Sequence, residues 1–248
     1  MKLILTHEQA EIEAIGALTP AQLALLKQVI AAAEARNLPL YLVGGPVRDL
    51  LLGHPTHDLD IVVEGDAIRI ANDLSDKFGG KVVSHRRFGT AKWQIKEIRS
   101  ALTDKLGIER SSTTDLPEFL DLISARTEIY ERPTALPTVE SSSIRLDLQR
   151  RDFTVNTLAI RLDHGHYGEL IDYFGGLADL HSKKIRVLHS LSFVDDPTRM
   201  LRAVRFEQRL GFQIEERTLQ LAEEARPLLH QVSGDRLRHE FDLAFREA

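Results

Sequence analysis

The chain has 248 residues, enough for one large domain or two small ones with a buried core. Hydrophobic residues make up 43% and charged residues 28%, as in ordinary globular proteins, and no stretch approaches the roughly 18 apolar residues of a membrane span. The lack of cysteine excludes disulfides, zinc–thiolate sites and a cysteine nucleophile, and it fits a cytoplasmic protein. Because the net charge is −5, any contact with nucleic acid must come from a local basic surface.

Helices and short strands are predicted to alternate in the first half of the chain. Thr19, Pro20 and Gln22 combine a capping box with proline at the first helical position, so a helix begins there and ends at Asn37. Further strands are predicted over residues 40–43, 58–63, 81–84, 88–98 and 120–125, and a helix capped by Asp66 over residues 67–78.

The polar segment from Arg99 to Glu118 is predicted to be an insertion or a mobile loop. Residues 154–162 and 167–171 form a predicted hairpin. From Asp196 onward only helices are expected, over residues 198–210, 216–226 and from 233 on. The pattern predicts an α/β domain of residues 1–187 and a helical domain of residues 188–248. We expect the helical domain to be truncated, because its last helix reaches the end of the chain at full amphipathic strength.

The first motif that carries chemistry is LVGGPVRDLLLGHPTHDLDIVV, residues 42–63. A strand leads into Gly44-Gly45 and a short helix starts at once, which places free backbone N–H groups near any bound anion. Arg48 lies on the first helical turn, where its guanidinium can bind the same anion. A Gly-Gly pair alone is usually just a turn, so the order of the whole motif carries the argument.

Two carboxylates follow in the same motif. On a strand, Asp58 and Asp60 would project to the same face, since residues i and i+2 do so. Adjacent carboxylates repel each other, and their hard oxygens suit Mg²⁺, including the metal sites of phosphoryl transfer. Asp121 lies inside another apolar strand, and we leave it out of the predicted site. We expect Trp93 in the core and His164 and His166 in a solvated turn. We assign no catalytic role to His54 and His57, which flank the carboxylates, because bound metal ions can activate a nucleophile.

Arginines dominate two later segments. Residues 150–156 read RRDFTVN, and residues 195–206 read DDPTRMLRAVRF. On a helix, Arg199, Arg202, Arg205 and Arg209 fall within one arc of about 120°. An amphipathic surface helix is the ordinary explanation of such a pattern. However, an arc without an interleaved acid concentrates like charge, and we expect a polyphosphate or an RNA backbone to relieve it.

Together these motifs resemble those of the class II tRNA nucleotidyltransferase and bacterial poly(A) polymerase family, within the DNA polymerase beta-like nucleotidyltransferases. The ordered match runs from about residue 40 to Phe241 and ends in SGDRLRHEF. This resemblance implies an α+β fold: a polymerase-beta-like head domain with a small mixed sheet, followed by an all-α neck domain. The chain departs from the usual pattern in Asp195, where the family has Glu, and in Pro46, where a small residue is common.

For the head domain, the resemblance implies that Gly45 and Arg48 contact a nucleoside triphosphate. Asp58 and Asp60 are the implied catalytic residues and Mg²⁺ ligands. Arg151 of the RRD motif is implied to bind the incoming nucleotide.

For the neck domain, the resemblance implies that Asp196 and Arg199 read the base of CTP or ATP. Both bases carry an exocyclic amine, which can donate a hydrogen bond to an acidic side chain. Both also carry ring acceptors, which can accept hydrogen bonds from an arginine. Arg202 and Arg205 are implied to support the nucleotide and its phosphates.

The function expected from this resemblance is template-independent, Mg²⁺-dependent addition of C, A or both, from CTP and ATP, to the 3′ end of tRNA. An enzyme restricted to CC or A addition and a poly(A) polymerase stay open, as does a non-catalytic RNA- or nucleotide-binding module. Residues 210–248 carry five bases and eight acids. We therefore expect these 248 residues to bind tRNA weakly, with most of the tRNA contacts made by regions that are absent here and none with a membrane.

Overall fold

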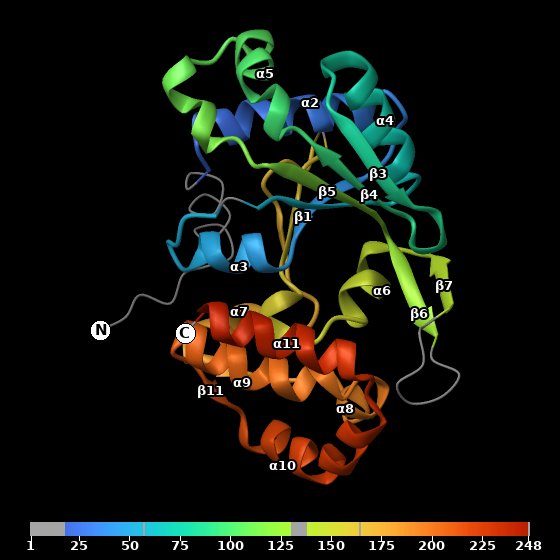
Figure 1. Cartoon of the computed structure of the whole chain (residues 1–248), viewed down its shortest axis with the longest axis vertical. Helices are drawn as coiled ribbons and strands as arrows, with labels where there is room; N and C mark the ends of the chain where they lie inside the picture. The colour runs from blue at the N-terminus through green and yellow to red at the C-terminus, as the bar shows by residue number, and fades with distance from the viewer. Residues whose placement is uncertain (1–17, 57, 130–137, 164, 248) are drawn as a thin grey trace. The chain divides into compact units, whose positions relative to one another are not determined.

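The structure is a computed structural model of the chain, and it describes residues 18–56, 58–129, 138–163 and 165–247 (Figure 1). Internal contacts group the described residues into two compact units. The first unit contains residues 18–127, 139–148 and 158–172, and the second contains residues 128–129, 138, 149–157 and 173–247, apart from the gaps just given. In the described part of the chain, no helix is both long and apolar enough to cross a bilayer.

A seven-stranded mixed sheet forms the core of the first unit. Its strand order is β3-β4-β5-β2-β1-β8-β9. Only β2 and β5 pair in parallel; the other neighbours are antiparallel. The strands are β1 (Leu40–Val43), β2 (Asp60–Val63), β3 (Lys81–His85), β4 (Thr90–Gln94), β5 (Phe119–Ser124), β8 (Ala159–Arg161) and β9 (Leu170–Ile171). This confirms the small mixed sheet of the prediction and the α+β fold class.

Two capped helices lie against the sheet. Helix α4 (Ala67–Phe78) packs on β4 and β5, and helix α2 (Pro20–Glu34) packs beside α4 (Figure 1). The Thr19 side chain accepts a hydrogen bond from the backbone N–H of Gln22, and the Gln22 side chain accepts one from Thr19, as the capping box predicts. Asp66 caps α4 in the same way by accepting from the backbone N–H of Arg69. Trp93 is fully buried, and its indole donates to the carbonyl of Gly79, so the prediction that it belongs to the core is confirmed.

The prediction of a loop at Arg99–Glu118 was wrong, because most of this segment is helical. Helix α5 (Arg99–Leu106) is followed by a 3-10 helix, η3 (Arg110–Asp115). Leu102 and Leu116 are fully buried and anchor the segment. Few apolar residues mark the buried side of α5, so helical periodicity could not be read from the sequence.

Short elements connect the sheet to the rest of the chain. Helix α3 (Gly45–Leu51) lies within the first motif, residues 42–63. The others are η1 (Arg86–Phe88), η2 (Lys96–Ile98), β6 (Arg126–Ile129), β7 (Thr138–Ser141), α6 (Ile144–Gln149) and η4 (Thr154–Asn156). Strands β6 and β7 make a separate two-stranded sheet. The predicted hairpin is shorter than expected, because β8 and β9 pair only over two positions and residues 154–156 form the 3-10 turn η4.

The second unit is mainly helical. Its elements are α7 (Gly176–Ser182), β10 (Lys184–Ile185), α8 (Ser192–Asp195), α9 (Thr198–Leu210), β11 (Gln213–Ile214), α10 (Glu216–Ala225), η5 (Arg226–Gln231) and α11 (Gly234–Glu247). Strand β11 pairs in parallel with β10, so the expectation of helices alone after Asp196 was wrong by this short strand. The rings of Phe153 and Phe206 meet edge to face at 5.8 Å and bring residues 149–157 into the core of this unit.

Candidate functional site

The turn between β1 and α3 has a backbone that only glycine adopts readily. Gly44 has φ 72° and ψ −129°, and its N–H donates to the carbonyl of Leu158 at 2.9 Å. Gly45 opens α3, and a Cβ added there would meet the Arg48 guanidinium at an ordinary 3.6 Å. Gly44 therefore shapes the turn, whereas Gly45 leaves space beside Arg48.

Replacing Gly44 by alanine is expected to destabilise the first unit by about 1–3 kcal/mol, because alanine is strained at this φ and ψ. Gly45→Ala is the matched control and should change the free energy of unfolding by less than about 0.5 kcal/mol. Urea denaturation followed by circular dichroism measures both variants. Equal stability of the two variants would contradict the role of Gly44.

Arg48 is buried and held by its neighbour. Only 1% of the residue is exposed, and its guanidinium donates to both carboxylate oxygens of Asp49 at 2.8 and 2.9 Å. The arginine that was predicted to bind phosphate thus lies next to Gly45 in a fixed orientation.

The two predicted metal-binding carboxylates begin β2, but only one belongs to the strand. Strand β2 starts at Asp60, and Asp58 is an exposed residue before it, so the prediction of a strand over 58–63 was wrong at its start. Asp60 is half-buried, and Ile61 and Val62 are fully buried. Because Asp58 lies outside the strand, strand alternation does not define the direction of its side chain. The effect of its charge on Asp121 shows instead that the two carboxylates interact.

Asp121 of β5 was left out of the predicted site, yet the structure brings it to the two carboxylates. Its Cα is paired in register with that of Asp60, so the two side chains project to the same face of the sheet. Burial raises the pKa of Asp121, the charge of Lys92 lowers it, and the charge of Asp58 raises it further, with a net upward shift. The Asp58 and Asp121 carboxylates are therefore close enough to repel each other. The sequence feature that could have identified Asp121 is the presence of an acid inside the apolar run LDLISA, residues 120–125.

Lys92 contacts the Asp121 carboxylate from the neighbouring strand. Its Nζ lies 3.5 Å from Asp121 Oδ2 and 3.5 Å from the centre of the Phe119 ring. Burial, the largest effect, keeps the pKa of Asp121 raised although the charge and hydrogen bond of Lys92 lower it.

These carboxylates have the chemistry of a site for a hard divalent cation. They offer only oxygen ligands, and their mutual repulsion would be relieved by a cation. Within the described residues, no group of three or more histidine, cysteine, aspartate or glutamate side chains is arranged to hold a metal ion by itself.

In the second unit, the two residues implied to read a base are both engaged. The Asp196 carboxylate accepts from the backbone N–H and the hydroxyl of Thr198, and from Arg236 at 2.7 Å. Asp196 thus caps the start of α9 from the position before the N-cap residue, Pro197. The buried Arg199 donates to the Ser192 hydroxyl and to the Arg150 carbonyl, both at 2.8 Å.

Arg202 is ion-paired with a buried acid of the RRD motif. Its guanidinium donates to Asp152 Oδ2 at 2.6 and 2.9 Å, and Asp152 Oδ1 accepts from Asn156 and from the backbone N–H of Phe153. Burial raises the pKa of Asp152, but the charge of Arg202 and these hydrogen bonds lower it by more, so its pKa lies below the ordinary value. The half-buried Arg151 directly precedes this acid.

The other arginines of the arc are paired with α11. Arg205 lies 2.7 Å from Glu247 and 3.5 Å from Glu240, and Arg209 lies 3.4 Å from Glu247. Glu240 and Glu247, which are distant in sequence, therefore relieve the repulsion between these arginines. We had expected a polyphosphate or an RNA backbone to do so.

The predicted site residues thus fall into two groups. Gly45, Arg48, Asp58 and Asp60 belong to the first unit, and Arg151, Asp196, Arg199, Arg202 and Arg205 belong to the second. His54 is exposed and His166 pairs with Glu169 at 3.0 Å, whereas His57 and His164 lie outside the described residues.

Comparison with known families decides the relationship. Residues 40–186 match the model of the poly A polymerase head domain, and residues 211–248 match a model described as "Probable RNA and SrmB- binding site of polymerase A". The chain belongs to the poly A polymerase head domain family. Nucleotidyltransferases of this family generally use a divalent metal.

Two curated members of the family are similar over most of this chain. The A-adding tRNA nucleotidyltransferase of Geobacter sulfurreducens is 46% identical over 226 residues, which are 90% of this chain and 24% of that protein. The enzyme of the same name from Halalkalibacterium halodurans is 43% identical over 234 residues, 93% of this chain and 50% of that protein. The chain thus spans between a quarter and a half of the length of these relatives.

Solved structures agree with this relationship. The apo form II of a CCA-adding enzyme is 43% identical, with a TM-score of 0.80 over 93% of this chain and 50% of that one. A CCA-adding enzyme in complex with ATP is 41% identical, with a TM-score of 0.77 over 94% of this chain and 49% of that one. The similarity therefore includes a family structure with a bound nucleotide.

Proposed function

We propose that this protein adds A, C or both, from ATP and CTP, to the 3′ end of tRNA without a nucleic-acid template. The observation that carries the proposal is the register of β2 and β5, which pairs Asp60 with Asp121; Asp58 lies just before β2, and the Gly44-Gly45 turn is close in sequence. Addition of A is the favoured activity, because the two relatives from Geobacter sulfurreducens and Halalkalibacterium halodurans are named A-adding enzymes.

In this proposal Asp58, Asp60 and Asp121 hold Mg²⁺, and Gly45 and Arg48 contact the triphosphate. When bound, Mg²⁺ neutralises phosphate charge and favours the deprotonated 3′-hydroxyl that attacks the α-phosphate. The Asp49 carboxylate keeps the Arg48 guanidinium in place. The backbone N–H groups at the start of α3 add partial positive charge for the pyrophosphate that leaves.

Arg151, Arg202 and Arg205 are proposed to bind the nucleotide from the second unit. A guanidinium carries five N–H donors, so an ion pair with one carboxylate does not exhaust it. Asp152, Glu240 and Glu247 would then orient Arg202 and Arg205 for the nucleotide.

Asp196 and Arg199 are proposed to read the base. Arg199→Ala is expected to relax discrimination of ATP and CTP against GTP and UTP by about 1–3 kcal/mol, roughly 5- to 150-fold, while triphosphate affinity changes less. Steady-state incorporation of each nucleotide measures this ratio. A proportional loss for all four nucleotides would show that Arg199 does not read the base. Asp196→Ala is the weaker test, because it also removes the cap of α9.

The function itself is tested with three tRNA substrates: one that ends before CC, one that ends before A, and one with complete CCA. Labelled AMP on the second substrate alone supports A addition, and labelled CMP on the first supports C addition. Repeated AMP addition to the third substrate would favour a poly(A) polymerase. Binding of nucleotide and RNA without incorporation would favour a non-catalytic module, which the retained carboxylates make the weaker alternative.

Two further predictions accompany this function. We propose a cytoplasmic location, because tRNA is the proposed substrate. We also keep the division into a head domain of residues 1–187 and a neck domain of residues 188–248 as a prediction. By internal contacts, residues 149–157 and 173–187 group with the helical unit.

A further inference from the structure

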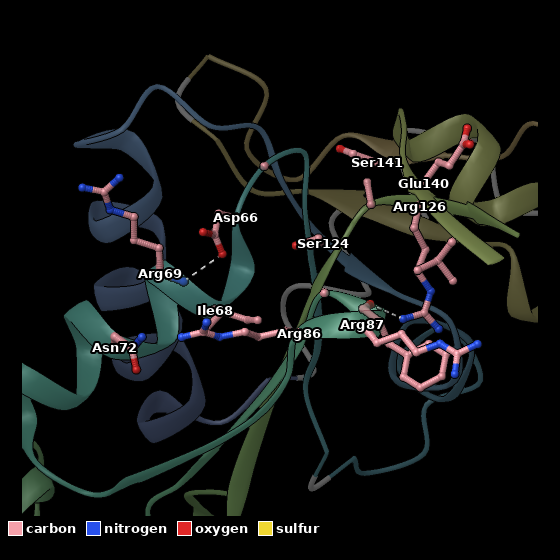
Figure 2. A pocket seen from close by; sticks show the side chains of 15 residues that line it. Asp66, Ile68, Arg69, Asn72, Arg86, Arg87, Ser124, Arg126, Glu140 and Ser141 are labelled. Atoms are coloured by element: carbon pink, nitrogen blue, oxygen red, sulfur yellow. Dashed lines mark hydrogen bonds between the residues drawn. The ribbon is translucent and has the colours of Figure 1, made fainter. Parts of the chain in front are cut away.

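A pocket of about 770 Å³ lies within the first unit, at the end of the sheet opposite to the start of β2. Its walls come from the turn after β2, the start of α4, the connection between β3 and β4, and strands β5 to β7 (Figure 2). None of the residues assigned above to the nucleotide lines it.

The lining of the pocket is basic although the chain is acidic. Four arginines, Arg69, Arg86, Arg87 and Arg126, face two acids, Asp66 and Glu140. Asp66 is already engaged as the cap of α4. The pocket therefore concentrates positive charge in a protein with a net charge of −5.

The arginines are spread along the pocket. Figure 2 shows the Arg86 side chain directed toward Ile68 and Asn72, whereas Arg87 and Arg126 lie on the other side of the β3–β4 connection. Arg126 donates to the carbonyl of Phe88 at 2.6 Å and is thereby fixed. Arg86 and Arg87 are exposed, and in the part of the chain that the structure describes neither has an ion pair with a carboxylate.

Close packing keeps the pocket walls in place. Gly89 has φ 60°, and a Cβ added there would lie 3.1 Å from the Cβ of Ser124. The Ser124 hydroxyl in turn accepts from the backbone N–H of Ala67 at the start of α4. The β3–β4 connection, β5 and α4 are thus fastened to one another, as in a preformed binding site.

We propose that this pocket binds the phosphodiester backbone of the RNA substrate. Guanidinium groups recognise phosphate through paired N–H donors, and arginines at both ends of an open pocket suit successive phosphates better than a single ion. Such contacts hold RNA without reading its sequence. The inference rests on the proposed tRNA substrate, and it supplies the local basic surface that the net charge requires.

The pocket is separate from the reacting centre. Ser124 follows Asp121 by three residues, about 10 Å along β5, and an odd spacing places the two side chains on opposite faces of the sheet. Loss of pocket arginines should therefore weaken RNA binding and leave nucleotide binding intact.

The test compares the full chain with the variants Arg86→Gln/Arg87→Gln and Lys27→Ala/Arg110→Ala. The second variant is the control: it also removes two positive charges, but from exposed positions on α2 and η3 outside the pocket. Binding of a tRNA transcript that ends in CC is measured between about 50 and 200 mM salt, and ATP binding with Mg²⁺ is titrated in parallel. The pocket variant should weaken RNA binding and lower the salt slope by about two units, with unchanged ATP affinity, whereas the control keeps the wild-type slope.

Three results would overturn the inference. One is an equal RNA affinity and salt slope in the two variants. Another is a loss of ATP affinity in the pocket variant, which would make this pocket a nucleotide site. The third is undetectable binding of the transcript by the wild-type chain at low salt. A chain that binds RNA through the pocket but incorporates no nucleotide would refute the proposed activity and leave this inference standing.

Discussion

Replacement of Asp58 or Asp60 by alanine is expected to lower nucleotide incorporation about 10³-fold or more, without unfolding the protein. This factor corresponds to about 4 kcal/mol of transition-state stabilisation, which is within the contribution of a metal-ion site to phosphoryl transfer. The fold should survive because Asp58 is exposed and Asp60 is half-buried. Removal of Asp58 also relieves its repulsion with Asp121.

The control for this prediction is Asp76→Ala, which removes an exposed acid from α4. Incorporation of labelled ATP into tRNA is measured against Mg²⁺ concentration, and circular dichroism checks the fold. Near-normal incorporation by Asp58→Ala or Asp60→Ala would refute the metal assignment. Asp121→Asn extends the series, and a higher Mg²⁺ requirement in that variant would support the third ligand.

Replacement of Asp152 by alanine is expected to destabilise the second unit by about 3–5 kcal/mol. The change leaves Arg202 with Glu240, at 3.7 Å, in place of its closer partner and removes the acceptor of Asn156 and of the Phe153 N–H. Loss of one partner of a buried ion pair costs about 3–5 kcal/mol because the other charge stays buried. Since the Arg202 side chain is 32% exposed, we expect the lower end of this range. The double variant Asp152→Asn/Arg202→Met removes both charges and should cost less than the sum of the single changes.

The stabilising effect of Asp152 should depend on pH. Its pKa is lower in the folded protein than the unfolded value of about 3.9, so the folded state binds fewer protons near that pH. The stabilisation is therefore fully present above about pH 5 and is lost as the pH falls through the folded pKa. The difference in unfolding free energy between wild type and Asp152→Asn should shrink over that range. A difference independent of pH from 6 to 2 would contradict the ion pair, and the exposed pair of Arg110 and Asp104 serves as control.

Local patterns predicted most of the regular elements. Caps and terminators act on backbone groups within a few residues, so the boundaries of α2, α4 and α9 could be read from Thr19, Asp66 and Gly211. The helix α5 escaped prediction because its burial depends on contacts with distant segments and leaves little periodicity in its own sequence.

The sequence by itself determined the chemistry of the candidate site, because the Gly44-Gly45 turn, Arg48 and the two aspartates lie within a short motif. Only the tertiary structure decided two other matters. The parallel register of β2 and β5 brings Asp121 beside Asp60, although about 60 residues separate them in the chain. The packing of α11 on α9 supplies Glu240 and Glu247 to Arg205, so the arginine arc is balanced within the protein. Strand register and helix pairing depend on side chains that are far apart in sequence, and the periodicity of a single segment does not contain them.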